Sequence, residues 1–253
     1  CGKPIINDET VKAISDLFRK EGSDAWYVKD TSEFLPEGFK CDECGCTEFI
    51  KEQDILDVWF DSGVTHAAVM GQRPELKWPA DLYLEGADQY RGWFQSSLLT
   101  SVACGNPAPY KAVCTHGWVV DGEGKKQSKS LGNVILPSEI IDQYGADILR
   151  IWVASSDYHA DIRISKDILK QLSEAYRKIR NTARYILGNL DGFNPDTDRV
   201  AYDEMFELDK WAYVRMNALN DKVRAGFEAL DYHVAFHAIH NFCVLDMSNF
   251  YLD

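Results

Sequence analysis

The chain has no apolar run long enough to cross a membrane, and its first residues lack the basic and then apolar pattern of a secretory signal. We therefore expect no membrane partner and a cytoplasmic location. A disulfide framework is also disfavoured, because the seven cysteines are odd in number and three of them cluster at Cys41, Cys44 and Cys46. This cysteine usage indicates a reducing compartment and a metal site.

The chain is also short of positive charge, with 27 Lys and Arg against 40 Asp and Glu and a net charge of −13. Nucleic-acid binding needs basic surface, so the composition alone does not favour it. One segment departs from this balance, since Lys166 to Arg184 holds more basic than acidic residues. A solvated helix face and a local RNA contact are both compatible with that segment.

The region from residue 54 to residue 155 has the pattern of an α/β fold. We expect buried strands at Leu82–Leu84 and Ala112–Thr115, and a helix over Gln89–Val102 between them. A strand–helix–strand order predicts parallel pairing with a right-handed crossover. Ligands bind at the carboxyl ends of such strands, where Glu85, Asp88 and His116 are expected.

Helical spacing predicts the other elements, and residues 23–49 are expected to be rich in loops. The predicted helices are 10–20, 137–144, 146–155, 166–190 with an end near Gly188, 205–228, and 232–252 after a break at Leu230 and Asp231. With 253 residues and 45% hydrophobic content, the chain can form more than one domain. We place the boundaries at 1–50, 51–160 and 161–253.

The stretch Lys126-Gln127-Ser128-Lys129-Ser130 combines two lysines and two hydroxyls. Such a loop suits the charge of a triphosphate from which pyrophosphate leaves, because this chemistry depends on positioning and charge stabilisation. A solvated turn is the alternative for these five residues alone. The neighbouring sequence strings decide between the two.

Three further strings precede this loop: Asp57–Gly63 (DVWFDSG), Leu84–Phe94 (LEGADQYRGWF) and His116–Trp118 (HGW). In this order and spacing, the four strings resemble the isoleucyl-tRNA synthetases, which are class I enzymes. The loop is similar to their KMSKS loop, with Gln127 in place of Met. The resemblance runs over essentially the whole chain.

The resemblance implies a fold and an activity. The expected fold is α/β, the second half of a Rossmann-type catalytic domain, with a zinc-ribbon-like module before it. An α-helical bundle follows, which contacts the tRNA stem and begins the anticodon-binding domain. The implied enzyme is an isoleucine–tRNA ligase, which forms isoleucyl-adenylate from isoleucine and ATP, with Mg²⁺ on the phosphates, and transfers it to tRNA(Ile). We expect a monomer.

The resemblance also assigns roles residue by residue. It implies that Lys126 and Lys129 act on the departing pyrophosphate. ATP is expected at His116, Gly117, Lys126, Ser128, Lys129 and Ser130, and the aminoacyl-adenylate at Trp59, Glu85, Gly86, Asp88 and Gln89. The structural alternatives are a helix-capping role for Glu85, a core position for Trp59 and a turn position for His116.

The Cys41-x-x-Cys44-Gly45 pattern is typical of a zinc knuckle. We expect Cys1, Cys41 and Cys44 as ligands of a structural zinc ion, with Cys46 as a substitute for a fourth ligand and a vestigial site as the alternative. A second candidate is weaker, because His233, His237 and His240 share a helix face without a partner carboxylate and beside an apolar stripe. We expect those histidines to be structural.

The phosphate-binding HIGH signature of class I enzymes occurs nowhere in the sequence, and the chain does not begin with Met. We therefore expect a fragment that is inactive alone. Two other readings stay open. One is a valyl or leucyl enzyme, which the strings at Asp57–Gly63 and Glu85–Trp93 disfavour. The other is a tRNA- or zinc-binding module without catalysis, which is disfavoured by the joint presence of both loop lysines with Glu85, Asp88 and Trp59.

Overall fold

The computed structural model describes all residues from 1 to 253, which divide into two compact units, Cys1–Asp57 and Val58–Asp253. The first unit contains α1 (Asp8–Glu21), α2 (Ala25–Val28) and the 3-10 turn η1 (Thr31–Glu33). Asn7 begins α1 as a cap, because its side chain accepts a hydrogen bond from the Thr10 amide at 2.9 Å. The rest of this unit is irregular, as predicted.

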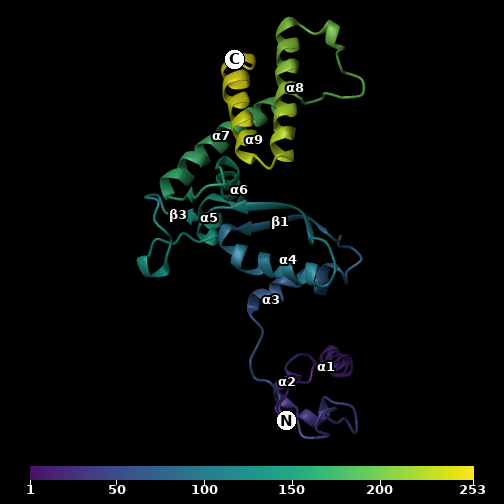
Figure 1. Ribbon diagram of the computed structural model, residues 1–253. Coiled ribbons are helices and arrows are strands. Elements are labelled where there is room, and N and C mark those ends of the chain that lie inside the picture. The colour runs from purple at the N-terminus through teal and green to yellow at the C-terminus, as the bar shows by residue number, and fades with distance from the viewer. The chain divides into compact units, whose positions relative to one another are not determined.

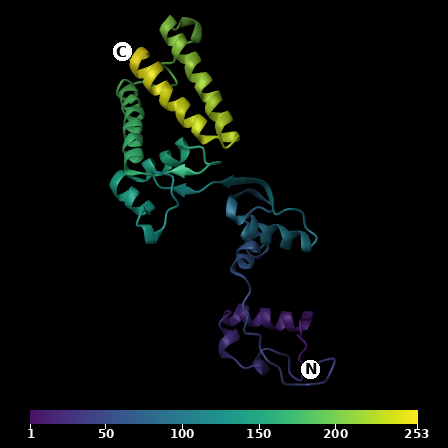
Figure 2. The same cartoon turned by 60° about the vertical axis from the view of Figure 1, so that its left-hand side comes forward.

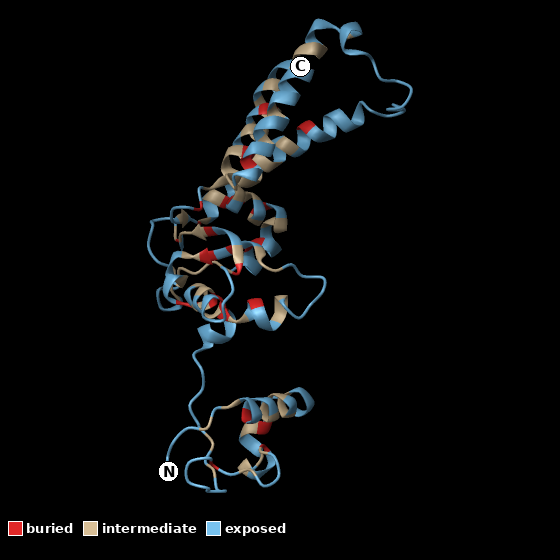
Figure 3. Cartoon of the chain, turned by 45° about the vertical axis from the view of Figure 1, so that its right-hand side comes forward, coloured by how far each residue is buried: buried red, intermediate tan, exposed pale blue.

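The core of the first unit is small and aromatic. The Trp26 ring lies 6.4 Å from the Phe18 ring and 5.1 Å from the Phe34 ring, measured between centroids. Lys51 ties the following segment back to this core, because its Nζ donates to the carbonyls of Trp26 and Lys29 at 2.6 and 2.5 Å. Few residues of this unit are buried (red in Figure 3), so local ties of this kind hold much of it.

The second unit contains a two-stranded parallel sheet. β1 (Ala80–Gly86) and β2 (Tyr110–His116) run side by side in Figure 1, with Glu85 opposite Thr115 and Gly86 opposite His116. The helix α4 (Trp93–Ala103) connects them and packs on the sheet through the buried Tyr83, whose ring contacts those of Trp93 and Phe94. The predicted strand–helix–strand order with parallel pairing is confirmed.

Two details of that prediction are wrong. The helix begins at Trp93 and not at Gln89, because residues 87–91 form the 3-10 turn η3 (Ala87–Arg91) and Gly92 leaves the helical region with φ −124° and ψ −136°. The strands are also less buried than predicted, since only Tyr83, Glu85 and Cys114 are buried in them. A sheet that α4 covers on one face leaves its other face open.

Two short helical elements pack around α4. They are α3 (Val58–Gly63) and the π-helical turn η2 (His66–Met70). Gly63 permits a close approach of α3 to α4, because a Cβ added to it would lie 2.6 Å from the Cβ of Ser96. This approach brings the Val58–Gly63 part of the first string against the crossover helix.

The segment Lys126–Ser130, the lysine loop, follows the first strand of a second small sheet. β3 (Val119–Val120) pairs in parallel with β4 (Ile162–Arg163), and between them come the 3-10 turn η4 (Lys129–Leu131), α5 (Pro137–Tyr144) and α6 (Ala146–Ser155). The predicted bounds of α5 and α6 are confirmed, with a proline at the first position of α5. The core of this region is Ile140, Ile148, Trp152, Ile164 and Leu169.

The last part of the second unit is helical. It contains α7 (Lys166–Gly188), η5 (Tyr202–Glu204), α8 (Glu207–Glu228), α9 (Tyr232–Asn241) and the π-helical run η6 (Phe242–Tyr251). Figure 2 shows α7, α8 and the C-terminal helical run side by side. The predicted break lies at Leu230, which turns the chain with a φ of +62°. None of these helices is long and apolar enough to span a membrane.

Candidate functional site

Glu85 is a buried carboxylate at the carboxyl end of β1, with 2% of its surface exposed. Its Oε1 accepts a hydrogen bond from the Thr115 hydroxyl at 3.0 Å, across the register of the two strands. Tyr90 donates to the same Thr115 oxygen at 3.4 Å. Its other oxygen, Oε2, is buried without a hydrogen-bond partner. Since buried polar atoms are normally paired, this oxygen is available to a ligand.

Burial raises the pKa of Glu85, and the charge of nearby Asp88 raises it further, while the hydrogen bond from Thr115 acts in the opposite direction. The side chain lies inside β1, and it does not cap the following turn, which has no side-chain cap. A buried carboxylate with one unpaired oxygen is stabilised strongly when a cationic or hydrogen-bond-donating ligand binds to it.

Gly86, Asp88 and Gln89 continue from Glu85 through η3. A Cβ on Gly86 would lie 2.7 Å from Oδ1 of Asp88 and 3.4 Å from a His116 ring carbon, so a side chain there would fill this space. The exposed Asp88 carboxylate accepts from the Gln89 side-chain amide at 2.9 Å. Gln89 in turn accepts from the Trp93 amide at 3.3 Å, which ties η3 to the start of α4.

His116 ends β2 next to this group. Its Nδ1 lies 2.8 Å from the Gly117 carbonyl, and the Gly117 amide donates to the Tyr158 carbonyl at 2.8 Å. A Cβ on Gly117 would lie 2.5 Å from the Ala160 carbonyl oxygen, so the backbones approach too closely for any other residue. Gly86 and His116 are also opposite each other in the register. Glu85, Gly86, Asp88 and His116 are therefore brought together at one edge of the sheet.

Lys126 and Lys129 are both exposed on the lysine loop. Neither Lys126 nor Lys129 makes an ion pair, whereas the adjacent Lys125 lies 2.7 Å from Glu123. The hydroxyl oxygens of Ser128 and Ser130 are 2.6 Å apart, and Ser128 caps η4 by accepting from the Ser130 amide at 3.2 Å. The loop thus presents two unpaired cations beside two hydroxyls.

Gln127 is directed back into the protein. Its Oε1 accepts from the Ile135 amide at 3.3 Å, and its Nε2 is buried without a hydrogen-bond partner. The residue therefore packs the loop against the segment that enters α5, and the two lysines on its flanks remain outside.

The sequence did not indicate three side chains that hold Glu85 and the lysine loop in place. Thr115 orients Glu85, and the pair Asp121 and Asn133 holds the lysine loop through hydrogen bonds at both of its ends. A hydroxyl opposite a strand-end carboxylate could have indicated Thr115. An Asp and an Asn that bracket a Lys- and Ser-rich loop are a usable signal for the other two, since both residue types bond readily to nearby backbone.

Trp59 lies on α3, with 42% of its surface exposed, and α3 packs mainly on α4. It is therefore no ordinary core residue. The three histidines of α9 form no group of potential metal ligands, and Phe236 contacts the rings of His237 and His240. An apolar groove in the helical part, lined by residues such as Tyr202, Phe206 and Met216, contains none of the predicted site residues.

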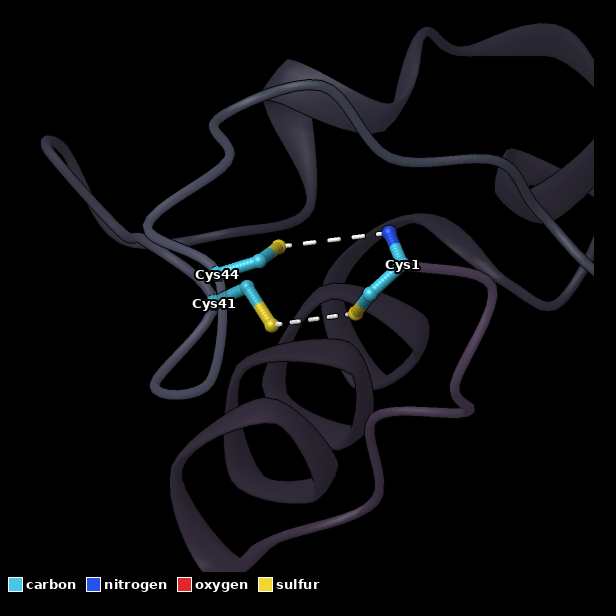
Figure 4. A group of neighbouring side chains, drawn as sticks. All are labelled: Cys1, Cys41 and Cys44. Carbon is cyan, nitrogen blue, oxygen red and sulfur yellow. Dashed lines mark hydrogen bonds between the residues drawn. The ribbon is translucent and has the colours of Figure 1, made fainter.

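Cys1, Cys41 and Cys44 converge in the first unit, where Figure 4 shows the sulfur atoms of Cys1 and Cys41 facing each other and the Cys44 sulfur facing the amino group of Cys1. All three sulfur atoms lie within 4.8 Å of one another, and those of Cys1 and Cys41 are 3.9 Å apart. Thiolates at about 2.3 Å from a tetrahedral zinc ion lie roughly 3.8 Å from each other, so the group fits zinc. Cys46 lies outside this group, because its sulfur bonds to the backbone of Glu48.

The sequence matches two family models. The model described as "tRNA synthetases class I (I, L, M and V)" matches residues 2–165, and that described as "Anticodon-binding domain of tRNA ligase" matches residues 209–253. The first match contains every predicted site residue except Cys1, and the second covers most of α8 through η6.

Proteins described as isoleucine–tRNA ligases are similar over the whole chain. Those of Caldanaerobacter subterraneus and Caldicellulosiruptor bescii are each 62% identical over 253 residues. The chain spans 27% and 28% of their lengths.

Two solved structures share the fold. The Agrobacterium radiobacter LeuRS in a ternary complex with tRNA and LeuAMS gives a TM-score of 0.68 at 21% identity, over 85% of this chain and 30% of that one. A Mycobacterium tuberculosis methionyl-tRNA synthetase with methionyl-adenylate gives 0.56 at 23% identity, over 74% and 38%.

Proposed function

Because the chain belongs to the class I tRNA synthetases, we propose that its full-length protein is an isoleucine–tRNA ligase and that residues 58–165 supply part of its activation site. The predicted resemblance to this class is confirmed by the matching family model. The observation that carries the proposal is the buried Glu85 with its unpaired Oε2, at the strand edge where Gly86 and His116 also lie. In a purely structural domain, a buried carboxylate with one unpaired oxygen would only lower the stability of the fold.

In the proposed site, Glu85 binds the ammonium group of isoleucine or of the isoleucyl-adenylate. Asp88 and Gln89 bind the ribose hydroxyls, and Gly86 lets the backbone approach the ligand. Trp59 supplies apolar surface for the branched side chain. A hydrophobic pocket distinguishes one methylene by only about 1–3 kcal/mol, a limit for which the isoleucyl enzymes are themselves a known example.

ATP is proposed to lie along His116, Gly117 and the lysine loop. The carboxylate oxygen of isoleucine attacks the α-phosphorus, the bond from that phosphorus to the bridging oxygen breaks, and pyrophosphate leaves. Lys126 and Lys129 stabilise the charge that builds up on the leaving group, and Ser128 and Ser130 add hydroxyl donors. The isoleucyl-adenylate then passes its acyl group to the 3′ end of tRNA(Ile).

Mg²⁺ is expected with ATP, held by the phosphates rather than by this chain. The one group of three or more potential metal ligands here consists of thiols, whereas Mg²⁺ takes oxygen ligands. Zinc suits the thiols, and we propose that Cys1, Cys41 and Cys44 hold a structural zinc ion. The pKa of the Cys44 thiol is lowered, first by a hydrogen bond from the backbone of Cys46, which favours the thiolate that zinc binds.

The finer domain plan belongs to the same proposal. Residues 1–50 form a zinc-ribbon-like module, residues 51–160 form half of a Rossmann-type domain, and residues 161–253 contact the tRNA stem and begin the anticodon-binding domain. The basic side chains of α7 support the RNA role, since Lys166, Lys170, Lys178, Arg180 and Arg184 make no ion pair.

Amino-acid-dependent ATP–pyrophosphate exchange by the full-length protein tests the proposal, with isoleucine, valine and leucine compared. Isoleucine is expected to be preferred over valine by about 10–200-fold. Residues 1–253 alone are expected to show no exchange, because they contain no HIGH signature. A preference for valine or leucine would point to those enzymes instead, and no exchange with any of the three would leave a binding module.

A further inference from the structure

The lysine loop is held in shape by two side chains that none of the proposed roles uses. The side-chain amide group of Asn133 contacts the backbone of the loop at two points. Its Oδ1 accepts from the Ser128 amide at 2.9 Å, and its Nδ2 donates to the Lys126 carbonyl at 3.2 Å. Both contacts are to backbone atoms that flank Gln127. The single side chain of Asn133 therefore fixes the backbone between the two lysines.

Asp121 holds Asn133 in turn. Its Oδ2 accepts from Asn133 Nδ2 at 2.8 Å, and its Oδ1 accepts from the amides of Glu123 and Lys125 at 3.0 and 2.8 Å. One carboxylate thus joins the turn before the lysines to the segment after them. The pKa of Asp121 is lowered, first by the hydrogen bond from Asn133, so the carboxylate stays ionised and keeps accepting.

The backbone around Asp121 and Asn133 also helps to hold the lysine loop in shape. Gly124 and Gly132 both have a positive φ, of +86° and +65°, and these two turns bring Asp121 and Asn133 together from either side of the loop. Ser128, held by Asn133, caps η4, on which Lys129 lies. The orientation of Lys129 therefore depends on a chain of contacts that begins at Asp121.

The side chains of the two lysines make no ion pair that would hold the loop. Both are exposed and neither makes an ion pair. Two neighbouring cations without counter-ions repel each other, so a fixed backbone has to oppose that repulsion for both to meet one phosphate group.

We propose that Asp121 and Asn133 form a clasp that positions Lys126 and Lys129 for the departure of pyrophosphate. This proposal rests on the proposed function, since it assigns the clasp to the activation step. The two residues are positioning residues, because they act through the loop backbone and contact no reacting atom. Breaking the clasp lowers the rate of adenylate formation and leaves the binding of isoleucine unchanged.

The test uses the full-length protein with Asn133→Ala, Asn133→Asp, and Asn133→Asp combined with Asp121→Asn. Asn106→Ala is the matched control, at an exposed asparagine outside the loop. Three quantities are measured: kcat and KM for isoleucine in ATP–pyrophosphate exchange, the rate of acyl transfer from preformed isoleucyl-adenylate to tRNA, and the rate of tryptic cleavage after Lys126 and Lys129.

Asn133→Ala is expected to lower the exchange kcat by about tenfold, the effect of one to two lost hydrogen bonds, with KM for isoleucine and the transfer rate within about twofold of wild type. Tryptic cleavage of the loop is expected to accelerate by a similar factor. Asn133→Asp places a carboxylate opposite Asp121 and is expected to lower kcat further. Adding Asp121→Asn restores a donor between the two positions and is expected to recover most of that loss.

Three results would overturn the clasp: an unchanged kcat in Asn133→Ala, an equal fall in exchange and transfer, or no recovery in the double variant. An equal fall would show general damage to the fold. If the wild-type protein shows no isoleucine-dependent exchange, the proposed function fails instead. In that case the tryptic cleavage rates still test whether Asp121 and Asn133 hold the loop. An unchanged cleavage rate in Asn133→Ala would exclude it.

Discussion

Glu85 and the lysine loop are held in opposite ways. Glu85 is 2% exposed on a regular strand, with one oxygen paired and the other left open. Lys126 and Lys129 are exposed on an irregular loop, whose backbone between them is held by two hydrogen bonds from the Asn133 side chain. Burial makes the first group rigid and its charge costly, whereas exposure leaves the charges of the second group solvated. In the proposed site, one side is therefore held by strand packing and the other by the hydrogen bonds of the Asp121–Asn133 clasp.

The largest expected effect comes from the exposed side, the lysine loop. Lys129→Ala in the full-length protein is expected to lower the exchange kcat by about 10²–10³-fold, as the loss of one transition-state donor does elsewhere. KM for isoleucine and thermal stability are expected to stay unchanged, because Lys129 is exposed and makes no ion pair. Lys125→Ala is the matched control, since this neighbouring lysine pairs with Glu123. Equal losses in both variants would contradict the assigned role.

A smaller effect is expected on the rigid side. Glu85→Gln keeps the shape and removes the charge, so KM for isoleucine is expected to rise by about 10–100-fold, the range for one charge-assisted hydrogen bond. The kcat is expected to change less than in Lys129→Ala. Glu75→Gln, the same change at an exposed position, serves as the control. A fall in kcat with an unchanged KM would place Glu85 in the chemical step and remove the contrast between the two sides.

The pH dependence of local stability sharpens the comparison further. The pKa of Glu85 is raised in the folded protein, so the folded state holds its proton at pH values where the unfolded chain has lost it. Stability from this group is therefore present below the ordinary carboxyl pKa and is lost as the pH rises through the raised pKa. Hydrogen exchange of β1 and β2 amides, between about pH 4 and pH 8, is expected to show this loss in wild type and not in Glu85→Gln. If the pH profiles of wild type and Glu85→Gln run parallel, Glu85 does not contribute to the pH dependence of stability.

The smallest expected effect is at Thr115. Thr115→Val removes the hydroxyl that donates to Glu85 and leaves both carboxylate oxygens unpaired. KM for isoleucine is expected to rise by about fivefold, the effect of one neutral hydrogen bond. Thr115→Ser keeps the hydroxyl and is expected to retain most of the wild-type KM. If both variants behave alike, the hydroxyl does not orient Glu85.

The pattern of the sequence predicted the positions of helices and strands well, but it predicted poorly which of their residues are buried. The bounds of α5 and α6 follow from Pro137 and Gly145, which act locally on the backbone, and the parallel pairing of β1 and β2 follows from the helix between them. The start of α4 was misplaced, because Gln89 and Gly92 form a 3-10 turn whose hydrogen bonds lie outside the helical pattern. The strands were expected to be buried, but α4 covers one face only.

The sequence by itself determined the class of the protein, because four short strings in a fixed order carry it, and it named Glu85, Asp88, His116 and both lysines as candidates. Only the tertiary structure decided how these residues are held. The partner of Glu85 comes from β2, and the clasp on the lysines joins Asp121 to Asn133 around the loop. Such contacts depend on which backbone atoms meet after folding, which hydrophobic pattern and residue spacing do not encode.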